Sequence, residues 1–145
     1  STELSIDVTS LAVQVHGGMG FIEETGAAQY YRDARILTIY EGTTAIQAND
    51  LIGRKTVRDG REVAKSLLAK VAATIEALGA QQGPAFDSMK KYLAQGHQSL
   101  GAAADFVVVN TKGNPNAVFA GSVPYLKLTG IMLAGWQMAR VARGG

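Results

Sequence analysis

The sequence has no cysteine and little histidine, and each absence excludes a kind of site. Without cysteine there is no disulfide bond, no thiolate metal ligand and no cysteine nucleophile, and the absence suits a reducing compartment. We therefore expect a cytoplasmic protein. The only two histidines, His16 and His97, lie far apart in the chain, so we expect no metal site.

Long apolar runs and strong charge are also missing. No segment reaches the roughly 18 uninterrupted apolar residues that a membrane-spanning helix needs, so we expect no membrane span. The formal net charge is only +2 and the basic residues are scattered, which argues against a nucleic acid as a partner. The chain does not begin with Met and opens within a helical pattern, so we expect a fragment of a longer protein.

Helix-forming residues, by contrast, are plentiful. Hydrophobic residues make up 47% of the chain, which is enough for a buried core, and proline is rare. Runs rich in alanine, leucine, lysine and glutamine favour helix over strand. We therefore predict an all-α fold.

The first part of the chain contains three expected helices. Apolar residues recur every three or four positions over residues 2–15, and the glycines of 16–20 end that helix. A second helix is expected over 23–35, beginning with two acids and ending with arginine. The third is expected to begin at Thr43 and Thr44 and to continue through Lys55.

The second part is predicted to be a three-helix, up-down-up extension. Its helices are expected over residues 61–78, 85–110 and 117–143, with Pro124 kinking the last one. The polar, glycine-containing stretch before them suggests a domain boundary. We place the two domains at residues 1–55 and 56–145.

One carboxylate stands out in the segment ILTIYEGTTAIQ, residues 36–47. Glu41 has no lysine or arginine three or four residues away, although solvated helical glutamates usually have one. Read alone, it could be an acid that stabilises the dipole at the start of a helix. The glycines of HGGMG are likewise ambiguous, because they could cradle a phosphate or only end the preceding helix.

Together, the segments VQVHGGMGFIEE and YYRDARILTIYEGTTAIQ resemble the C-terminal part of the acyl-CoA dehydrogenases, flavoenzymes that introduce a double bond between Cα and Cβ of an acyl-CoA thioester. The residues in register with that family are Gln14, Gly17, Gly18, Gly20, Arg32, Asp33, Tyr40, Glu41, Gly42, Thr43 and Gln47. The resemblance implies the end of the family's C-terminal helical bundle over residues 1–55.

The resemblance implies that Glu41 is the catalytic base that removes the α-proton of the substrate. A carboxylate buried among apolar groups and the flavin becomes a stronger base, and a neighbouring lysine would cancel that effect. Tyr40 and Gly42 would then lie beside the substrate, where Gly42 lets the thioester approach the backbone. Hydride would pass to flavin N5.

FAD is the cofactor that the resemblance implies. Thr43 and Thr44 would lie near its pyrophosphate, at the start of a helix. Gln14, Gly17 and Gly18 resemble the segment that contacts the adenosine part of an FAD held largely by a neighbouring subunit. One position departs from the family pattern, because Ala45 replaces a longer polar residue that contacts FAD in several relatives.

The remainder of the chain is similar to a subgroup with an extra C-terminal helical domain, which includes dehydrogenases acting on 3-methylthiopropanoyl-CoA. The resemblance implies an acyl-CoA substrate, an electron-transfer flavoprotein as acceptor and a homo-oligomer, either dimer or tetramer. The fragment alone is expected to be inactive. Two alternatives stay open: a helical interaction or oligomerisation module without chemistry, and an acyl-CoA oxidase.

Overall fold

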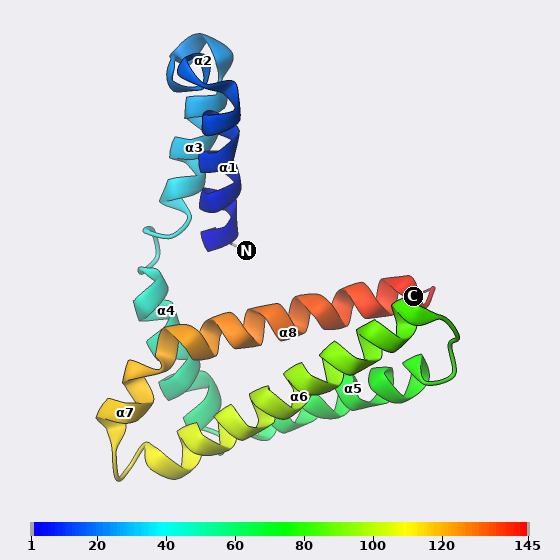
Figure 1. Ribbon diagram of the computed structural model, residues 1–145. Coiled ribbons are helices and arrows are strands. Elements are labelled where there is room, and N and C mark those ends of the chain that lie inside the picture. Colours follow the sequence, from blue (N-terminus) through cyan, green and yellow to red (C-terminus); the bar gives the residue numbers. More distant parts are fainter. Residues whose placement is uncertain (1, 145) are drawn as a thin grey trace. The chain divides into compact units, whose positions relative to one another are not determined.

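The computed structural model describes residues 2–144, and within them every regular element is a helix or helical turn (Figure 1). The predicted all-α fold is therefore confirmed. The chain forms two compact units, Ser1–Gln47 and Ala48–Gly145. In the described part of the chain, no helix is both long enough and apolar enough to cross a membrane.

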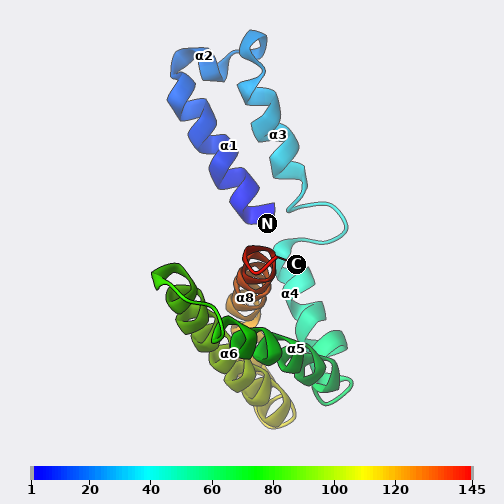
Figure 2. The same ribbon diagram turned by 90° about the vertical axis from the view of Figure 1, so that its right-hand side faces the viewer.

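The first unit is built on a pair of helices that run side by side (Figure 2). Its elements are α1 (Thr2–His16), α2 (Gly18–Phe21), the 3₁₀ turn η1 (Glu23–Thr25), α3 (Ala27–Ile36) and the first residues of α4 (Thr44–Asp50). The helix expected over residues 2–15 is confirmed by α1. Ile6 of α1 and Ala34 of α3 are buried. The small side chain of Ala34 lets the two helices approach closely.

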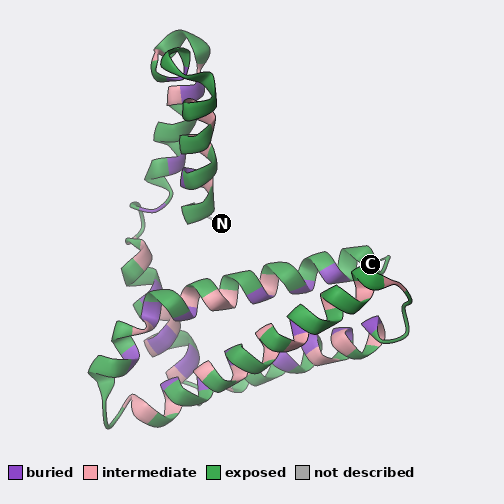
Figure 3. Cartoon of the chain, viewed as in Figure 1, coloured by how far each residue is buried: buried purple, intermediate pink, exposed green. Residues whose placement is uncertain are grey.

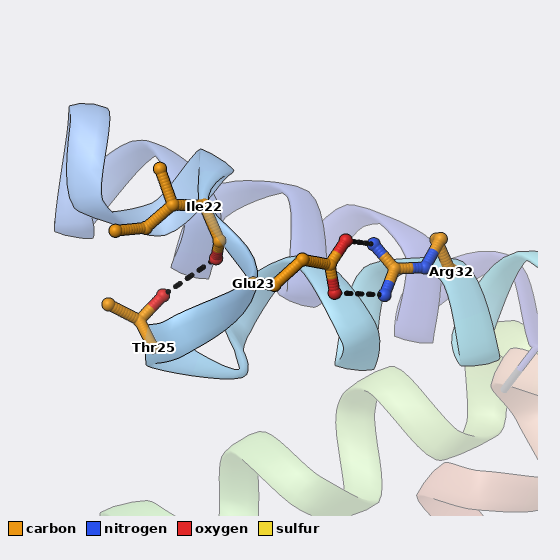
Figure 4. Close-up of polar contacts among 4 residues, drawn as sticks. All are labelled: Ile22, Glu23, Thr25 and Arg32. Carbon is orange, nitrogen blue, oxygen red and sulfur yellow. Dashed lines mark hydrogen bonds and ion pairs between the residues drawn. The ribbon is translucent and has the colours of Figure 1, made fainter.

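The second expected helix starts later than the sequence suggested. We expected it at Glu23, but Gly26 has a φ of 75° and separates η1 from α3. The left-handed conformation stops one helical segment before the next begins, and glycine adopts it without steric cost. The Gly26 amide donates to the Glu23 carbonyl at 3.0 Å and closes the 3₁₀ turn. The Thr25 hydroxyl lies 3.2 Å from the carbonyl oxygen of Ile22 (Figure 4).

The third expected helix is present but changes character along its length. It begins at Thr44 as α4 and continues from Leu51 to Val57 as the π-helical segment η2, past the expected end at Lys55. The two compact units divide within α4. The domain boundary that we placed at residues 55 and 56 stays a prediction, because compact units and domains of separate ancestry need not divide at the same residue.

The second unit contains the region of the predicted three-helix extension and begins before it, at Ala48. Its elements are η2 (Leu51–Val57), α5 (Glu62–Leu78), α6 (Pro84–Asn110), α7 (Pro115–Ala120) and α8 (Ser122–Ala142). The long α6 packs against both α5 and α8, and the buried residues gather where these helices face one another (Figure 3). Pro84 begins α6, where a missing N–H costs no hydrogen bond.

The last expected helix is instead two helices. Asn114 caps α7, since its side-chain Oδ1 accepts a hydrogen bond of 3.2 Å from the amide of Ala117. The chain then breaks at Gly121, which separates α7 from α8. The kink expected at Pro124 was wrong. Pro124 is the third residue of α8, where the N–H has no helical partner in any case.

Two buried hydrogen bonds join α8 to other parts of this unit. The Trp136 indole N–H donates to the hydroxyl of Thr74 on α5 at 2.8 Å, and the Tyr125 hydroxyl lies 3.2 Å from that of Thr56 in η2. Each threonine donates its single proton to a carbonyl of its own helix. The threonine oxygen must therefore accept from the aromatic residue, so each pair has one defined direction.

This arrangement predicts that Thr74→Val destabilises the second unit by about 1–3 kcal/mol, because the buried Trp136 N–H loses its acceptor. Trp136 is the single tryptophan, so its fluorescence during urea unfolding reports on this unit. Thr129→Val is the matched control, since the Thr129 hydroxyl bonds only to a carbonyl of its own helix. The control should stay within about 0.5 kcal/mol; equal losses in both variants would contradict the assignment.

Candidate functional site

The candidate site lies in the turn that links α3 to α4. Beyond Ile36 the chain makes tight turns, with the amides of Ile39 and Tyr40 both donating to the Ile36 carbonyl at 3.0 and 3.1 Å. Glu41 and Gly42 then adopt φ values of 57° and 100°. These two successive residues with positive φ turn the backbone toward α4.

The backbone of Glu41 is strained. Only one other non-glycine residue within 2–144 has a positive φ, and that residue is Arg61, which forms a 2.6 Å ion pair with Asp105. A left-handed residue with a Cβ costs about 1–2 kcal/mol and persists only where its surroundings hold it. Such outliers cluster at functional sites, which makes the position of Glu41 informative.

Gly42 is required by the shape of this turn. A Cβ added there would lie 3.0 Å from Ile46 Cγ2, and the φ of 100° is unfavourable for any side chain. The family resemblance assigned Gly42 to the contact with substrate. The shape of the turn is a second and separate reason for glycine at position 42.

Glu41 and its neighbours are exposed in this chain. Tyr40 is 53% exposed and Ile39 is 49% exposed, so the chain does not by itself bury the carboxylate. No cation lies within salt-bridge distance of Glu41 among residues 2–144. The burial expected for a base would have to come from groups outside this chain, and it stays a prediction.

Backbone amides near Glu41 are available as hydrogen-bond donors. The Glu41 amide makes no hydrogen bond to another group in the part of the chain that the structure describes. Thr43 is the N-cap residue of α4. Its carbonyl accepts the first hydrogen bond of that helix, from the Gln47 amide at 3.0 Å. The first amides of α4 follow, and the first amides of an α-helix have no helical partner. An oxyanion or a phosphate is the kind of group that such amides bind.

Two side-chain contacts of this turn were not anticipated. The Gln47 side-chain amide donates to the Glu41 carbonyl at 2.7 Å, and the Thr44 hydroxyl donates to the Glu3 carboxylate on α1. Sequence reasoning placed Gln47 only in the register of the family resemblance and did not mention Glu3. The bond to Glu41 spans six residues of an irregular turn, which periodicity cannot foresee.

The glycine-rich segment lies at the opposite end of α1. Gln14 is exposed, and Gly17 has φ 59° and ψ −140°, a conformation that only glycine readily adopts. Glu3, which bonds to Thr44 beside Glu41, and Gln14 are eleven residues apart on α1. At the helical rise per residue, that separation is about 16 Å. The first unit therefore does not gather Gln14, Gly17 and Gly18 at the Glu41 turn.

An ion pair joins α3 to η1 and does not involve Glu41. Arg32 forms two parallel hydrogen bonds with Glu23, at 2.9 and 2.8 Å (Figure 4). This hydrogen-bonded carboxylate raises the pKa of the Arg32 guanidinium above its ordinary value. Within residues 2–144, no cluster of three or more histidine or acidic side chains could hold a metal ion.

Comparison with known proteins gives the chain its family. Residues 1–56 match the family described as acyl-CoA dehydrogenase, C-terminal domain, and residues 67–144 match the one described as acetyl-CoA dehydrogenase C-terminal like. A 3-methylmercaptopropionyl-CoA dehydrogenase from Ruegeria pomeroyi is 49% identical over 99% of this chain. The chain belongs to the acyl-CoA dehydrogenase family.

The relatives of this acyl-CoA dehydrogenase chain are much longer than the chain itself. It spans 26% of the Ruegeria pomeroyi protein. It also spans 22% of a broad-specificity linear acyl-CoA dehydrogenase from Mycobacterium tuberculosis, which is 31% identical over 90% of this chain. A butyryl-CoA dehydrogenase from Syntrophomonas wolfei is 47% identical over 41% of this chain and 10% of its own length. The match to the first of these relatives extends over both units.

The structure predicts that Gly42→Ala loosens the turn of this acyl-CoA dehydrogenase chain. Added strain of about 1–2 kcal/mol corresponds to roughly tenfold faster amide hydrogen exchange over residues 37–47. Gly130→Ala is the control, because Gly130 lies within α8 and a Cβ there would contact nothing within 4 Å. Exchange over 37–47 that is equal in the two variants would show that the turn does not need glycine.

Proposed function

We propose that this chain supplies the catalytic base, Glu41, to an FAD-dependent acyl-CoA dehydrogenase. The observation that carries the proposal is the strained backbone of Glu41, which holds a carboxylate without a cationic partner among exposed apolar side chains. The register of the family resemblance supports the same residue. An ordinary helix-dipole acid needs no left-handed backbone, so that reading explains less.

The proposed chemistry is the removal of two hydrogens from adjacent carbons. The Glu41 carboxylate takes the proton from Cα of the acyl-CoA, and the electron pair of that bond forms the new Cα–Cβ double bond. The hydrogen on Cβ would leave with its electron pair, and FAD, when bound, would supply the acceptor for that hydride. The Glu41 amide, which has no partner among the described residues, would donate to the thioester carbonyl as negative charge builds there.

Burial by the assembled enzyme would complete the base. The side chains of Ile39 and Tyr40, which precede Glu41 in the chain, are about half exposed and so are available to be covered with it. Covering it with substrate and flavin would remove water from the carboxylate and make it a stronger base. Gly42 would keep the approach to the backbone open for the thioester.

The residues beside Glu41 fit an FAD pyrophosphate. Thr43 is exposed, and the first amides of α4 offer unpaired donors suited to a doubly charged anion. Thr44 would contribute mainly its backbone, because its hydroxyl already bonds to Glu3. Gln14, Gly17 and Gly18, about one helix length away, would contact the adenosine part of an FAD bound mainly by a neighbouring subunit, which requires a homo-oligomer.

We further propose an acyl-CoA substrate and an electron-transfer flavoprotein as acceptor. The 49% identity to a 3-methylmercaptopropionyl-CoA dehydrogenase makes that thioester the first substrate to test. The isolated chain would be inactive, because residues 2–144 offer no burial for Glu41. Residues from 56 onward would form the separate, extra helical domain of the parent enzyme.

Substitution of the base tests this proposal in the full-length parent enzyme. Glu41→Gln should lower turnover of 3-methylmercaptopropionyl-CoA by about 10²–10⁴-fold, because the amide cannot accept the α-proton. FAD content, read from visible absorbance, should stay unchanged. Glu24→Gln is the matched control, since Glu24 is an exposed acid of the first unit.

The alternatives predict different results. Turnover retained in Glu41→Gln would favour an interaction module and contradict the proposal. The electron acceptor is tested separately with the unsubstituted enzyme. Peroxide formed in preference to a reduced flavoprotein acceptor would favour an acyl-CoA oxidase, which uses the same base.

A further inference from the structure

We propose that Gln47 is a positioning residue that holds the Glu41 backbone in its left-handed conformation. This inference rests on the proposed function of Glu41. Gln47 makes two hydrogen bonds in the turn: its backbone amide donates to Thr43, and its side-chain Nε2 donates to the Glu41 carbonyl at 2.7 Å. The first bond starts α4, and the second ties α4 back to Glu41.

The strained backbone of Glu41 requires an interaction that stabilises it. A non-glycine residue with a φ of 57° tends to relax to a negative φ unless another interaction opposes it. The net contribution of one hydrogen bond is of the same order as the left-handed penalty. Gln47 is the only described residue whose side chain bonds to the Glu41 carbonyl, so its loss should shift the conformational balance.

The Gln47 side-chain amide lies beside Gly42. A Cβ at Gly42 would lie 3.0 Å from Ile46 Cγ2 and 3.5 Å from Gln47 Nε2. The second separation is an ordinary van der Waals contact, so the φ of 100° at Gly42, more than lack of space, is what favours glycine beside the Gln47 side chain. Ile46 occupies the neighbouring side of the same turn.

The choice of glutamine is chemically specific. The Glu41 carbonyl requires a hydrogen-bond donor, which excludes an ionised glutamate at position 47. A lysine could donate, but its positive charge near the Glu41 carboxylate would weaken the base. Glutamine donates without adding charge. A rotation about φ of Glu41 would change the direction of the whole side chain, so this neutral bond would set the aim of the carboxylate.

Gln47→Met in the full-length enzyme tests the inference, because methionine keeps the length and loses the donor. We expect kcat to fall about tenfold, which is the effect of losing roughly one hydrogen bond. KM should stay within about twofold and FAD content should be unchanged, because substrate and flavin contacts remain. Gln29→Met is the matched control, an exposed glutamine on α3 in the same unit.

The outcomes separate this inference from the proposed function. If Glu41→Gln is inactive and the kcat of Gln47→Met equals that of Gln29→Met, the positioning role is wrong, but the proposal that Glu41 is the base is unaffected. If Glu41→Gln retains turnover, both fail. A loss of FAD, or a rise in KM with kcat unchanged, would show a merely structural role and overturn the inference. If Gln47→Met does not fold, Gln47→Leu, which also lacks the donor and adds no charge, is measured with the same readouts.

Discussion

The reversal of the chain at Glu41 and Gly42 is the constraint on which the candidate site depends. Two successive residues with positive φ lead from the end of α3 toward α4. Glycine suits position 42 because its φ of 100° is unfavourable for any side chain, and the Gln47 side-chain amide donates to the Glu41 carbonyl. The backbone of Glu41 is held by this turn, and no ion pair to its carboxylate is formed among the described residues.

The two units serve different purposes in this account. The first carries the Glu41 turn, a Glu41 amide without a partner among the described residues, and many exposed apolar side chains. The second has its own core around Ile52, Val71 and Leu78, and the described residues leave no side-chain polar atom buried without a partner. Its threonine–aromatic hydrogen bonds give α8 a defined register, because an indole or phenol must meet a particular hydroxyl.

Much of the fold could be predicted from the sequence, since α1, α5 and α6 have apolar residues at helical spacing. The breaks at Gly26 and Gly121 were missed, because a lone glycine is tolerated within a helix and only tertiary packing decides whether it ends one. The π-helical segment η2 was missed for a similar reason. Its Thr56 meets Tyr125 from 69 positions further along the chain, a contact that no local pattern encodes.

The residues of the candidate site come from the sequence and their roles stay a prediction, whereas the geometry of the site comes from the structure alone. Glu41 was identified by its isolation among apolar neighbours and by the family resemblance. Its left-handed backbone was not, because glutamate has no preference for that conformation. The role of Gln47 could not be inferred either, since its bond to Glu41 depends on that unusual φ.

The most direct test of the central claim measures the proton transfer alone. The full-length enzyme, with its FAD chemically reduced so that no hydride can be accepted, would be incubated in D₂O with 3-methylmercaptopropionyl-CoA. Our account predicts that deuterium enters the α-carbon in the unsubstituted enzyme and that Glu41→Gln abolishes this exchange. Exchange at the same rate in the variant would contradict the claim that Glu41 is the base.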